Sequence, residues 1–213
     1  MLYAGTATVI AGAIGFLVAA SPRLLSRRLG PGLIRVASLG YALPGTILAI
    51  GLLGPLALAD SAFAAASTAM FGAAPALIGL GTGGALVIAY LVRFLAVAIG
   101  TCEAGLARVP PSLPDAARML GRGPLATVAR VQLPLTWPAL MSGALLFFVD
   151  CVKELPATLL LRPLNVETLA THLYGEAARG TYEDGTVAAL LIVLVGLIPV
   201  AVLLRLGSRE TRA

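Results

Sequence analysis

The stretch PDAARMLGRGPLATVARVQLP, residues 114–134, separates two of the longest apolar runs of the chain. It is polar, it is bounded by prolines, and it carries Arg118, Arg122 and Arg130. The chain around it is apolar, since 59% of its 213 residues are hydrophobic and 12% are charged, with a mean hydropathy of +0.96. A soluble domain is about half apolar and about 25% charged. This composition leaves too little polar surface for a soluble domain and predicts an integral membrane protein.

Five apolar runs have the length of a membrane span, which takes about 20 residues. They are Leu2–Ala20, Val36–Ala59, Leu77–Gly100, Pro138–Leu159 and Thr186–Leu206. Irregular backbone cannot face lipid, so each run is predicted to be a helix and the fold class to be all-α. Pro44 and Pro55 are expected to kink the second span.

The arginines are concentrated in alternate connecting segments. Ser21–Arg35, Thr101–Trp137 and the C-terminal tail hold most of them, whereas Asp60–Ala76 has none and Leu160–Gly185 has Arg162 and Arg179. The arginines of the first group are Arg23, Arg27, Arg28, Arg35, Arg108, Arg118, Arg122, Arg130, Arg205, Arg209 and Arg212. Cytoplasmic loops carry an excess of basic residues. We therefore expect the opening stretch in the cytoplasm, the N-terminus in the periplasm and the C-terminus in the cytoplasm.

Local signals divide the opening stretch into two short helices. Ser112 and Asp115 have the spacing of a capping box, and Gly121 fits the left-handed position after a helix end. Pro124 suits the first turn of a second helix, which Pro134 is expected to end. The first helix, Leu113–Leu120, would carry Leu113, Ala116, Ala117 and Leu120 on one face. These features predict an elbow outside the bilayer. Either the small residues of the elbow let the surface of another molecule approach closely, or the elbow lies as a loop among phospholipid headgroups.

The spacing of the elbow is similar to the EAA signature of ABC importer permeases. Asp115-Ala116-Ala117, three residues, Gly121, nine residues, Val131, one residue and Leu133-Pro134 follow that signature, with Asp for Glu and Val for Ile. The resemblance implies a type I ABC importer transmembrane domain whose loop, about 104–137, contains a coupling helix. It also implies that a cytoplasmic ATPase dimer docks on this helix. The implied coupling residues are Asp115, Ala116, Ala117, Gly121, Val131, Leu133 and Pro134.

Three further stretches resemble the second half of ferric-iron permeases. They are SLGYALPGTILAIGLL (38–53), YLVRFLAVAIGTCEAGL (90–106) and KELPATLLLRP (153–163). The resemblance implies that a periplasmic solute-binding protein delivers ferric iron for transfer across the bacterial inner membrane. Permeases for thiamine, sulfate and polyamines share the architecture. Since that family's usual chain carries two such halves, residues 1–213 are expected to form one domain. The chain is then a C-terminal half, a split subunit or a permease that dimerises.

Charged residues occur in or near the third and fourth spans. Asp150 and Glu154 share a helix face, with Lys153 beside them. These three residues either line the translocation pathway or lie at the membrane interface beyond the helix end. Arg93 lies inside the third span, and we expect it to form an ion pair with Asp150 or Glu154. A secondary transporter driven by an ion gradient would also use intramembrane acids, but it has no need of a cytoplasmic elbow.

Other functions find little support in the sequence. The G-x-G-x-x-G pattern at Gly79, Gly81 and Gly84 lacks the βαβ context of a dinucleotide site. No G-x-x-x-x-G-K-[ST] phosphate loop occurs, so we expect ATP hydrolysis by a separate subunit. A membrane-embedded enzyme would need a cluster of nucleophile, base or metal ligands inside the spans, and with one histidine, outside them, we expect no enzymatic activity, cofactor or metal site in this chain. The single histidine, His172, is expected in a solvated external segment with Tyr182, Glu183 and Asp184. The net charge of +5 comes from the arginines that set the membrane topology, so we expect no nucleic acid partner.

Overall fold

The computed structural model describes residues 1–24, 29–72 and 79–210, with the backbone alone for residues 200 and 202–210. Arg27, Arg28 and Arg212 lie outside the described residues. Every regular element in the described part of the chain is helical, which confirms the all-α prediction. In chain order they are α1 (Leu2–Leu24), α2 (Leu29–Ser38), the 3-10 turn η1 (Leu39–Ala42), α3 (Gly45–Phe71), α4 (Gly83–Ala107), α5 (Ser112–Met119), α6 (Pro124–Thr127), the π turn η2 (Val128–Gln132), α7 (Leu133–Lys153), α8 (Pro156–Leu161), α9 (Leu169–Arg179) and α10 (Tyr182–Glu210).

Among the described residues, five helices are long and apolar enough to cross a membrane, as the sequence predicts. They are α1, α3, α4, the continuous helix Pro124–Lys153 formed by α6, η2 and α7, and the Tyr182–Pro199 part of α10. The second span begins at Gly45 rather than at Val36. Pro44 precedes this helix as its N-cap instead of lying within it, while Pro55 lies inside the helix. A proline suits a helix start because it needs no hydrogen-bond acceptor for its nitrogen there.

The fourth span ends earlier than predicted. Helix α7 stops at Lys153 rather than at Leu159, because the backbone of Glu154 is extended with ψ of 119°. Pro156 then begins the separate short helix α8. Asp150 therefore lies within the last turn of α7, and the break between α7 and α8 falls at the charged residues.

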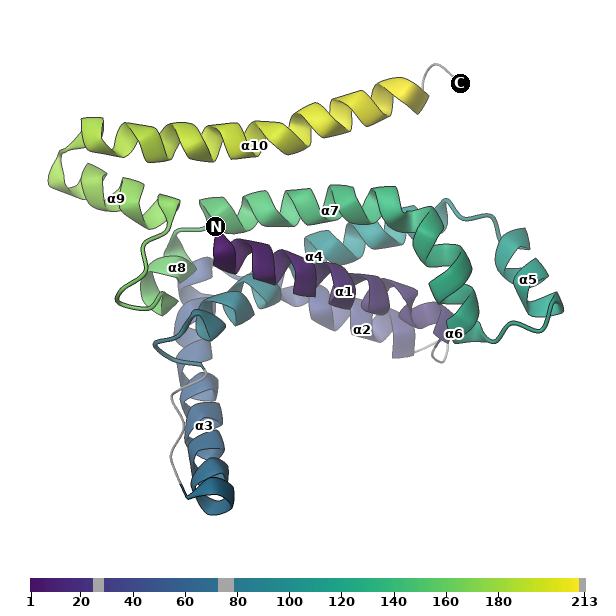
Figure 1. Ribbon diagram of the computed structural model, residues 1–213, viewed down its shortest axis with the longest axis horizontal. Helices are drawn as coiled ribbons and strands as arrows, with labels where there is room; N and C mark the ends of the chain where they lie inside the picture. Colours follow the sequence, from purple (N-terminus) through teal and green to yellow (C-terminus); the bar gives the residue numbers. More distant parts are fainter. Residues whose placement is uncertain (25–28, 73–78, 211–213) are drawn as a thin grey trace.

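Helices α1, α4 and α7 form the centre of the molecule, and each packs on the other two (Figure 1). Alanines of α1, among them Ala7 and Ala11, are fully buried, and their small side chains allow close approach of the helices. Phe94 of α4 meets Phe147 of α7 edge to face, with ring centroids 6.2 Å apart. Helix α10 packs on α9 and α7 along one side. Along the long axis, the start of α1 lies nearer to α9 and the end of α10 lies nearer to α5 (Figure 1).

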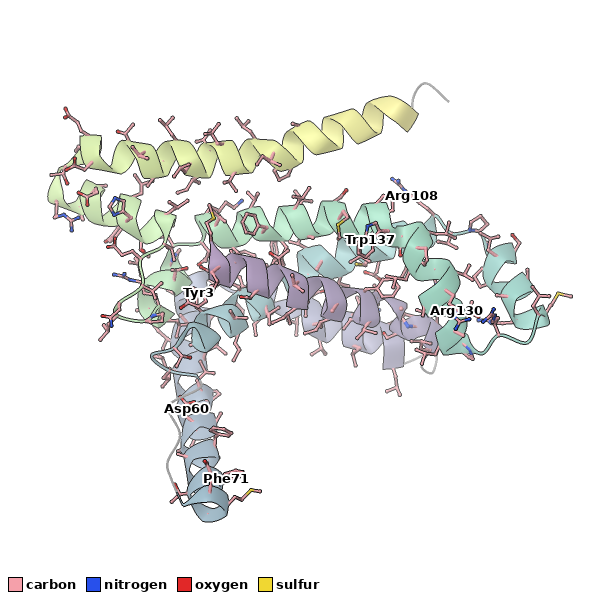
Figure 2. The ribbon with its side chains drawn as sticks, in the orientation of Figure 1. Tyr3, Asp60, Phe71, Arg108, Arg130 and Trp137 are labelled. Carbon is pink, nitrogen blue, oxygen red and sulfur yellow. The ribbon has the colours of Figure 1, made fainter. Side chains whose placement is uncertain are left out.

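Helix α3 leaves the bundle and runs across the direction of the other long helices (Figure 1). Asp60 lies partway along it and Phe71 at its far end (Figure 2). The predicted start of an external loop at Asp60 is therefore wrong, since the helix continues to Phe71. The Asp60 carboxylate is buried and accepts the backbone N–H groups of Gly79 and Leu80 at 2.7 and 2.8 Å. These bonds compensate for burying a charge in an apolar helix and hold the chain at the approach to α4.

Candidate functional site

The elbow begins with α5, which starts at Ser112 with Pro111 as its N-cap and no side-chain cap. The capping-box prediction is wrong, because such a box requires Ser112 to precede the helix and it is instead the first helical residue. Asp115 pairs with Arg118 one turn along, with Oδ1 and Nη1 3.2 Å apart. Both side chains are more than half exposed, so this pair contributes little to stability.

Gly121 forms the turn after α5, in the left-handed conformation that the sequence predicts. Its φ is +78°, a region that favours glycine. The N–H of Gly121 donates to the carbonyl of Arg118 at 2.9 Å, and the N–H of Arg122 donates to the carbonyl of Ala117 at 3.0 Å. These two bonds form a Schellman motif, which satisfies the last carbonyls of a helix. A Cβ added at Gly121 would meet no described atom within 4 Å, so backbone conformation alone requires glycine here.

The second helix of the elbow begins at Pro124, as predicted, but Pro134 does not end it. Helix α6 passes through the π turn η2 directly into α7. A proline within a helix has no N–H, and its ring meets the carbonyl four residues earlier. The π turn, in which the Leu133 N–H donates to the carbonyl of Val128, opens the helix just before Pro134 and relieves this conflict. The helix bends between η2 and α7 (Figure 1).

Arg23, at the end of α1, connects the elbow to the bundle. Its guanidinium donates to Oε1 of Gln132 at 3.1 Å and to the carbonyl of Leu106 at 2.9 Å. Gln132 is 2% exposed and belongs to the π turn, while Leu106 belongs to the last turn of α4. Helices α1 and α4 and the π turn that leads from the elbow into α7 therefore meet at one side chain. Sequence reasoning assigned Arg23 only a topological role, because nothing in its local sequence indicates these distant partners.

Asp150, Lys153, Glu154 and Arg93 come together in the structure. Together with Tyr41 and Phe94 they line a recess of about 490 Å³, called the polar recess below. Lys153 Nζ lies 2.8 Å from Asp150 Oδ1, and Arg93 Nε lies 3.2 Å from Glu154 Oε2. Arg93 therefore pairs with one of its two expected partners, and the recess contains two ion pairs.

The Arg93–Glu154 pair also joins two breaks in the helices. Arg93 Nη1 donates to the carbonyl of Leu43, just before α3 begins, at 3.3 Å. Glu154 Oε1 accepts the N–H of Ala157 in the first turn of α8 at 3.0 Å. Gly45, the first residue of α3, leaves room for the pair, since a Cβ there would lie 2.7 Å from Glu154 Oε1. One ion pair thus fixes the start of α3, the middle of α4 and the start of α8.

Comparison with known proteins identifies the family. The family model of the binding-protein-dependent transport system inner membrane component matches residues 11–212. The chain belongs to this family of permeases. The matched residues contain both the elbow and the polar recess, and the permease is an integral inner membrane protein with five apolar helices in its described part.

Curated relatives of the permease carry names with different solutes. The Fe(3+)-transport system permease protein FbpB 2 of Haemophilus influenzae is 31% identical over 118 residues, 55% of this chain and 23% of that protein. The putative 2-aminoethylphosphonate transport system permease protein PhnV of Salmonella choleraesuis is 34% identical over 109 residues, which are 51% of this chain and 40% of that protein. The maltose/maltodextrin transport system permease protein MalG of Escherichia coli is 32% identical over 133 residues, which are 62% of this chain and 44% of that protein. The permease matches less than half the length of each.

A solved structure shares the fold of the permease. A chain of the MetNI methionine ABC transporter in inward-facing conformations superposes with a TM-score of 0.60. The match covers 94% of this chain and 93% of that chain, at 18% sequence identity. At this identity the likeness concerns the fold alone, and it confirms the type I ABC importer architecture that the sequence predicts.

The permease exposes its elbow residues unequally. Asp115, Ala116 and Gly121 are exposed, whereas Ala117 is 8% exposed and faces the rest of the chain. Of the other signature positions, Pro134 is exposed and Val131 and Leu133 are half-buried. A partner that approaches the elbow would therefore meet Asp115, Ala116 and Gly121, with Ala117 supporting α5 from inside.

Large apolar side chains also project from the tip of the elbow. Met119 is 89% exposed, Leu120 83% and Leu125 68%. Sequence reasoning concentrated on small residues and missed Met119 and Leu125. Their signal in the sequence was the presence of apolar residues in the most polar segment of the chain. Exposed apolar side chains that flank a tight turn are well suited to contact another protein.

The predicted external segment carries a polar cluster on α9. Glu176 accepts a hydrogen bond from Thr181 Oγ1 at 2.6 Å and pairs with Arg179. The hydrogen bond from Thr181, followed by the contact with Arg179, holds the pKa of Glu176 below its usual range. His172 Nδ1 lies 3.2 Å from Glu167 Oε2. The described residues include no group of three metal-ligating side chains here or elsewhere. The cluster therefore stabilises the turn between α9 and α10.

Proposed function

We propose that this chain is a permease subunit of an ATP-driven ABC importer, which moves a solute from a periplasmic binding protein across the inner membrane. The observation that carries the proposal is the elbow. It is closed by a Schellman turn at Gly121, it projects apolar side chains at its tip, and it is joined to α1, α4 and α7 through Arg23. A partner that moved this elbow would move the central helices with it.

The mechanism follows from this connection. A cytoplasmic ATPase dimer grips α5 around Asp115, Ala116 and Gly121, and its closure on ATP displaces the elbow. Because η2 and α7 form one continuous helix, the displacement is transmitted along α7 to the polar recess. The helices then shift as packed bodies between inward-facing and outward-facing arrangements. This chain performs no covalent chemistry in that scheme, and ATP hydrolysis belongs to the partner.

The remaining partners follow from the same proposal. A binding protein meets the end that carries α9, in the periplasm, and the elbow lies in the cytoplasm. A second permease half or a second copy of this chain completes the translocation pathway. The C-terminus is cytoplasmic and the N-terminus periplasmic, as the distribution of arginines predicts.

The candidate solutes come from the sequence resemblance and from the names of the relatives. Ferric iron is the candidate that the sequence resemblance favours, and one relative is named as an Fe(3+) permease. The other relatives are named for 2-aminoethylphosphonate and for maltose, so thiamine, sulfate and polyamine carriers are not the only alternatives. Uptake of radioactive iron by cells that express the complete system, with and without this chain, would test the iron candidate.

The coupling role is tested by replacing Gly121 with valine. A β-branched residue is strained at the φ of +78°, so the Schellman turn is lost and α5 no longer holds its position. We expect the variant to reach the membrane at normal abundance but to lose co-purification with the ATPase and ATP-dependent uptake. Both are measured on the complete transporter.

Gly123→Val is the matched control. Gly123 lies two residues away, it is also exposed, and a Cβ there also meets no described atom within 4 Å, but its φ is −67°. This variant should keep ATPase binding and uptake. If Gly121→Val retained both activities, the coupling role of the elbow would be rejected. If uptake followed an ion gradient without ATP, the ABC mechanism itself would be rejected.

A further inference from the structure

The polar recess is unusual because it carries four charged side chains among membrane helices. Lys153 is 60% exposed, Arg93 21% and Asp150 19%. Arg93 lies about 15 Å along α4 from its first residue, at 1.5 Å per residue, and so well inside the span. Charged groups at such depth face an aqueous pathway or other protein rather than lipid. The recess therefore faces water or protein rather than lipid, and a solute can reach it only in an aqueous pathway.

The charges in the recess are balanced. Two cations face two anions, and they are already paired as Asp150 with Lys153 and Arg93 with Glu154. Glu154 is 5% exposed, and its second oxygen is occupied by the N–H of Ala157. A bare multivalent cation needs several carboxylate or other oxygen ligands at once, and only the half-buried Asp150 carboxylate has a partner, Lys153, that is open to water and can be exchanged. An anion would likewise find both cations of the recess, Arg93 and Lys153, already paired with carboxylates.

The two pairs differ in how readily they exchange. Asp150 and Lys153 are joined one turn apart at the end of α7, and Lys153 is open to water. A pair whose cation is open to water is held weakly, so a ligand can displace Lys153 from Asp150. A ligand with both charges can separate the pair and leave neither residue unpaired. Its ammonium group replaces Lys153 at Asp150, and its acidic group replaces Asp150 at Lys153.

We propose that the polar recess admits small zwitterions, solutes that carry an ammonium group and a carboxylate or phosphonate, by exchange with the Asp150–Lys153 pair. The Arg93–Glu154 pair forms the fixed wall of this site. A volume of about 490 Å³ accommodates a solute of amino-acid size. This inference names the solute class and rests on the proposed transport function.

The experiment uses the fact that Lys153 is the only lysine of the chain. The full chain in lipid nanodiscs is treated with an amine-acylating reagent, and mass spectrometry measures modification of Lys153 relative to the N-terminal amine. The probe is N,N-dimethylglycine, a zwitterion whose tertiary amine does not consume the reagent. Isovalerate is the matched anion, N,N-dimethylpropylamine the matched cation, and ferric citrate represents the iron candidate.

We expect N,N-dimethylglycine to lower the acylation of Lys153, relative to that of the N-terminal amine, several-fold. The single-charge analogues should leave this ratio unchanged. Asp150→Asn should abolish the protection, whereas Glu167→Gln, an exposed carboxylate outside the recess, should keep it. Equal protection by isovalerate, protection by ferric citrate instead of the zwitterion, or protection that survives Asp150→Asn would overturn the inference. Because the assay contains neither ATPase nor binding protein, such a failure is separate from a failure of ATP coupling.

Discussion

Two ion pairs of the same chemistry lie in the polar recess, but water reaches them to different degrees. Arg93 and Asp150 are similarly half-buried, at 21% and 19%, but the partner of Arg93, Glu154, is 5% exposed, whereas the partner of Asp150, Lys153, is 60% exposed. Removing one partner of a buried pair leaves an uncompensated charge. Removing one partner of an exposed pair leaves a charge that water can solvate. The Arg93–Glu154 pair should therefore be structural, and the Asp150–Lys153 pair exchangeable.

This difference predicts unequal effects on stability. Arg93→Met should lower the free energy of unfolding by about 3 kcal/mol, because Glu154 then stays buried without its cation. Lys153→Met is the control and should change it by less than about 1 kcal/mol. The double variant Arg93→Met/Glu154→Gln should recover part of the loss, since it removes the buried charge as well. Denaturant titration in mixed micelles measures all four proteins, and equal losses for the two single variants would contradict the assignment.

At the scale of helices, α4 and α7 are held together by small residues. Gly143 of α7 lies directly against Thr101 of α4, and a Cβ added at Gly105 of α4 would lie 2.6 Å from the Cβ of Ala139. Such contacts let two backbones approach closely in a membrane, where there is no hydrophobic drive between helices. In the proposed mechanism, a movement of the elbow that passes along α7 reaches α4 through this contact as well as through Arg23.

A single methyl group should disturb this contact. In Gly143→Ala, the new Cβ overlaps Oγ1 of Thr101 and lies 2.9 Å from its Cβ, so the helices must separate. We expect a loss of about 1–3 kcal/mol in the free energy of unfolding. Gly100→Ala, next to Thr101 on α4, meets no described atom within 4 Å and should be close to neutral. A neutral Gly143→Ala, measured in the same titration, would show that the two helices do not depend on close packing.

The helices also show how far the sequence determines the structure. Hydropathy predicted five spans because length and apolar composition are local properties, and Gly121 was predictable because its turn depends on its own φ. Pro134 was misjudged because its effect depends on the π turn before it. Asp60 was placed in a loop because its partners, the N–H groups of Gly79 and Leu80, lie about twenty residues away. The partners of Arg23 are more distant still and left no local signal.

At the scale of the whole molecule, charge is distributed unevenly along the long axis. Arg108 and Arg130 lie at the end that carries the elbow, and Tyr3 lies toward the opposite end (Figure 2). Arg23 also lies at the elbow end, through its bonds to Gln132 and the end of α4. The fold thus brings basic residues from separate segments together at one end. The positive-inside rule applies to that end as a unit and favours a cytoplasmic elbow.

Accessibility of single cysteines tests this orientation. Leu164, between α8 and α9, is 98% exposed, and Leu120, at the elbow tip, is 83% exposed. The native Cys102 and Cys151 are each 1% exposed, so they should give little background. In intact spheroplasts, a membrane-impermeant maleimide should label Leu164→Cys at once and label Leu120→Cys only after permeabilisation. The opposite pattern would place the elbow in the periplasm, where no ATPase can reach it, and the proposed mechanism could not operate.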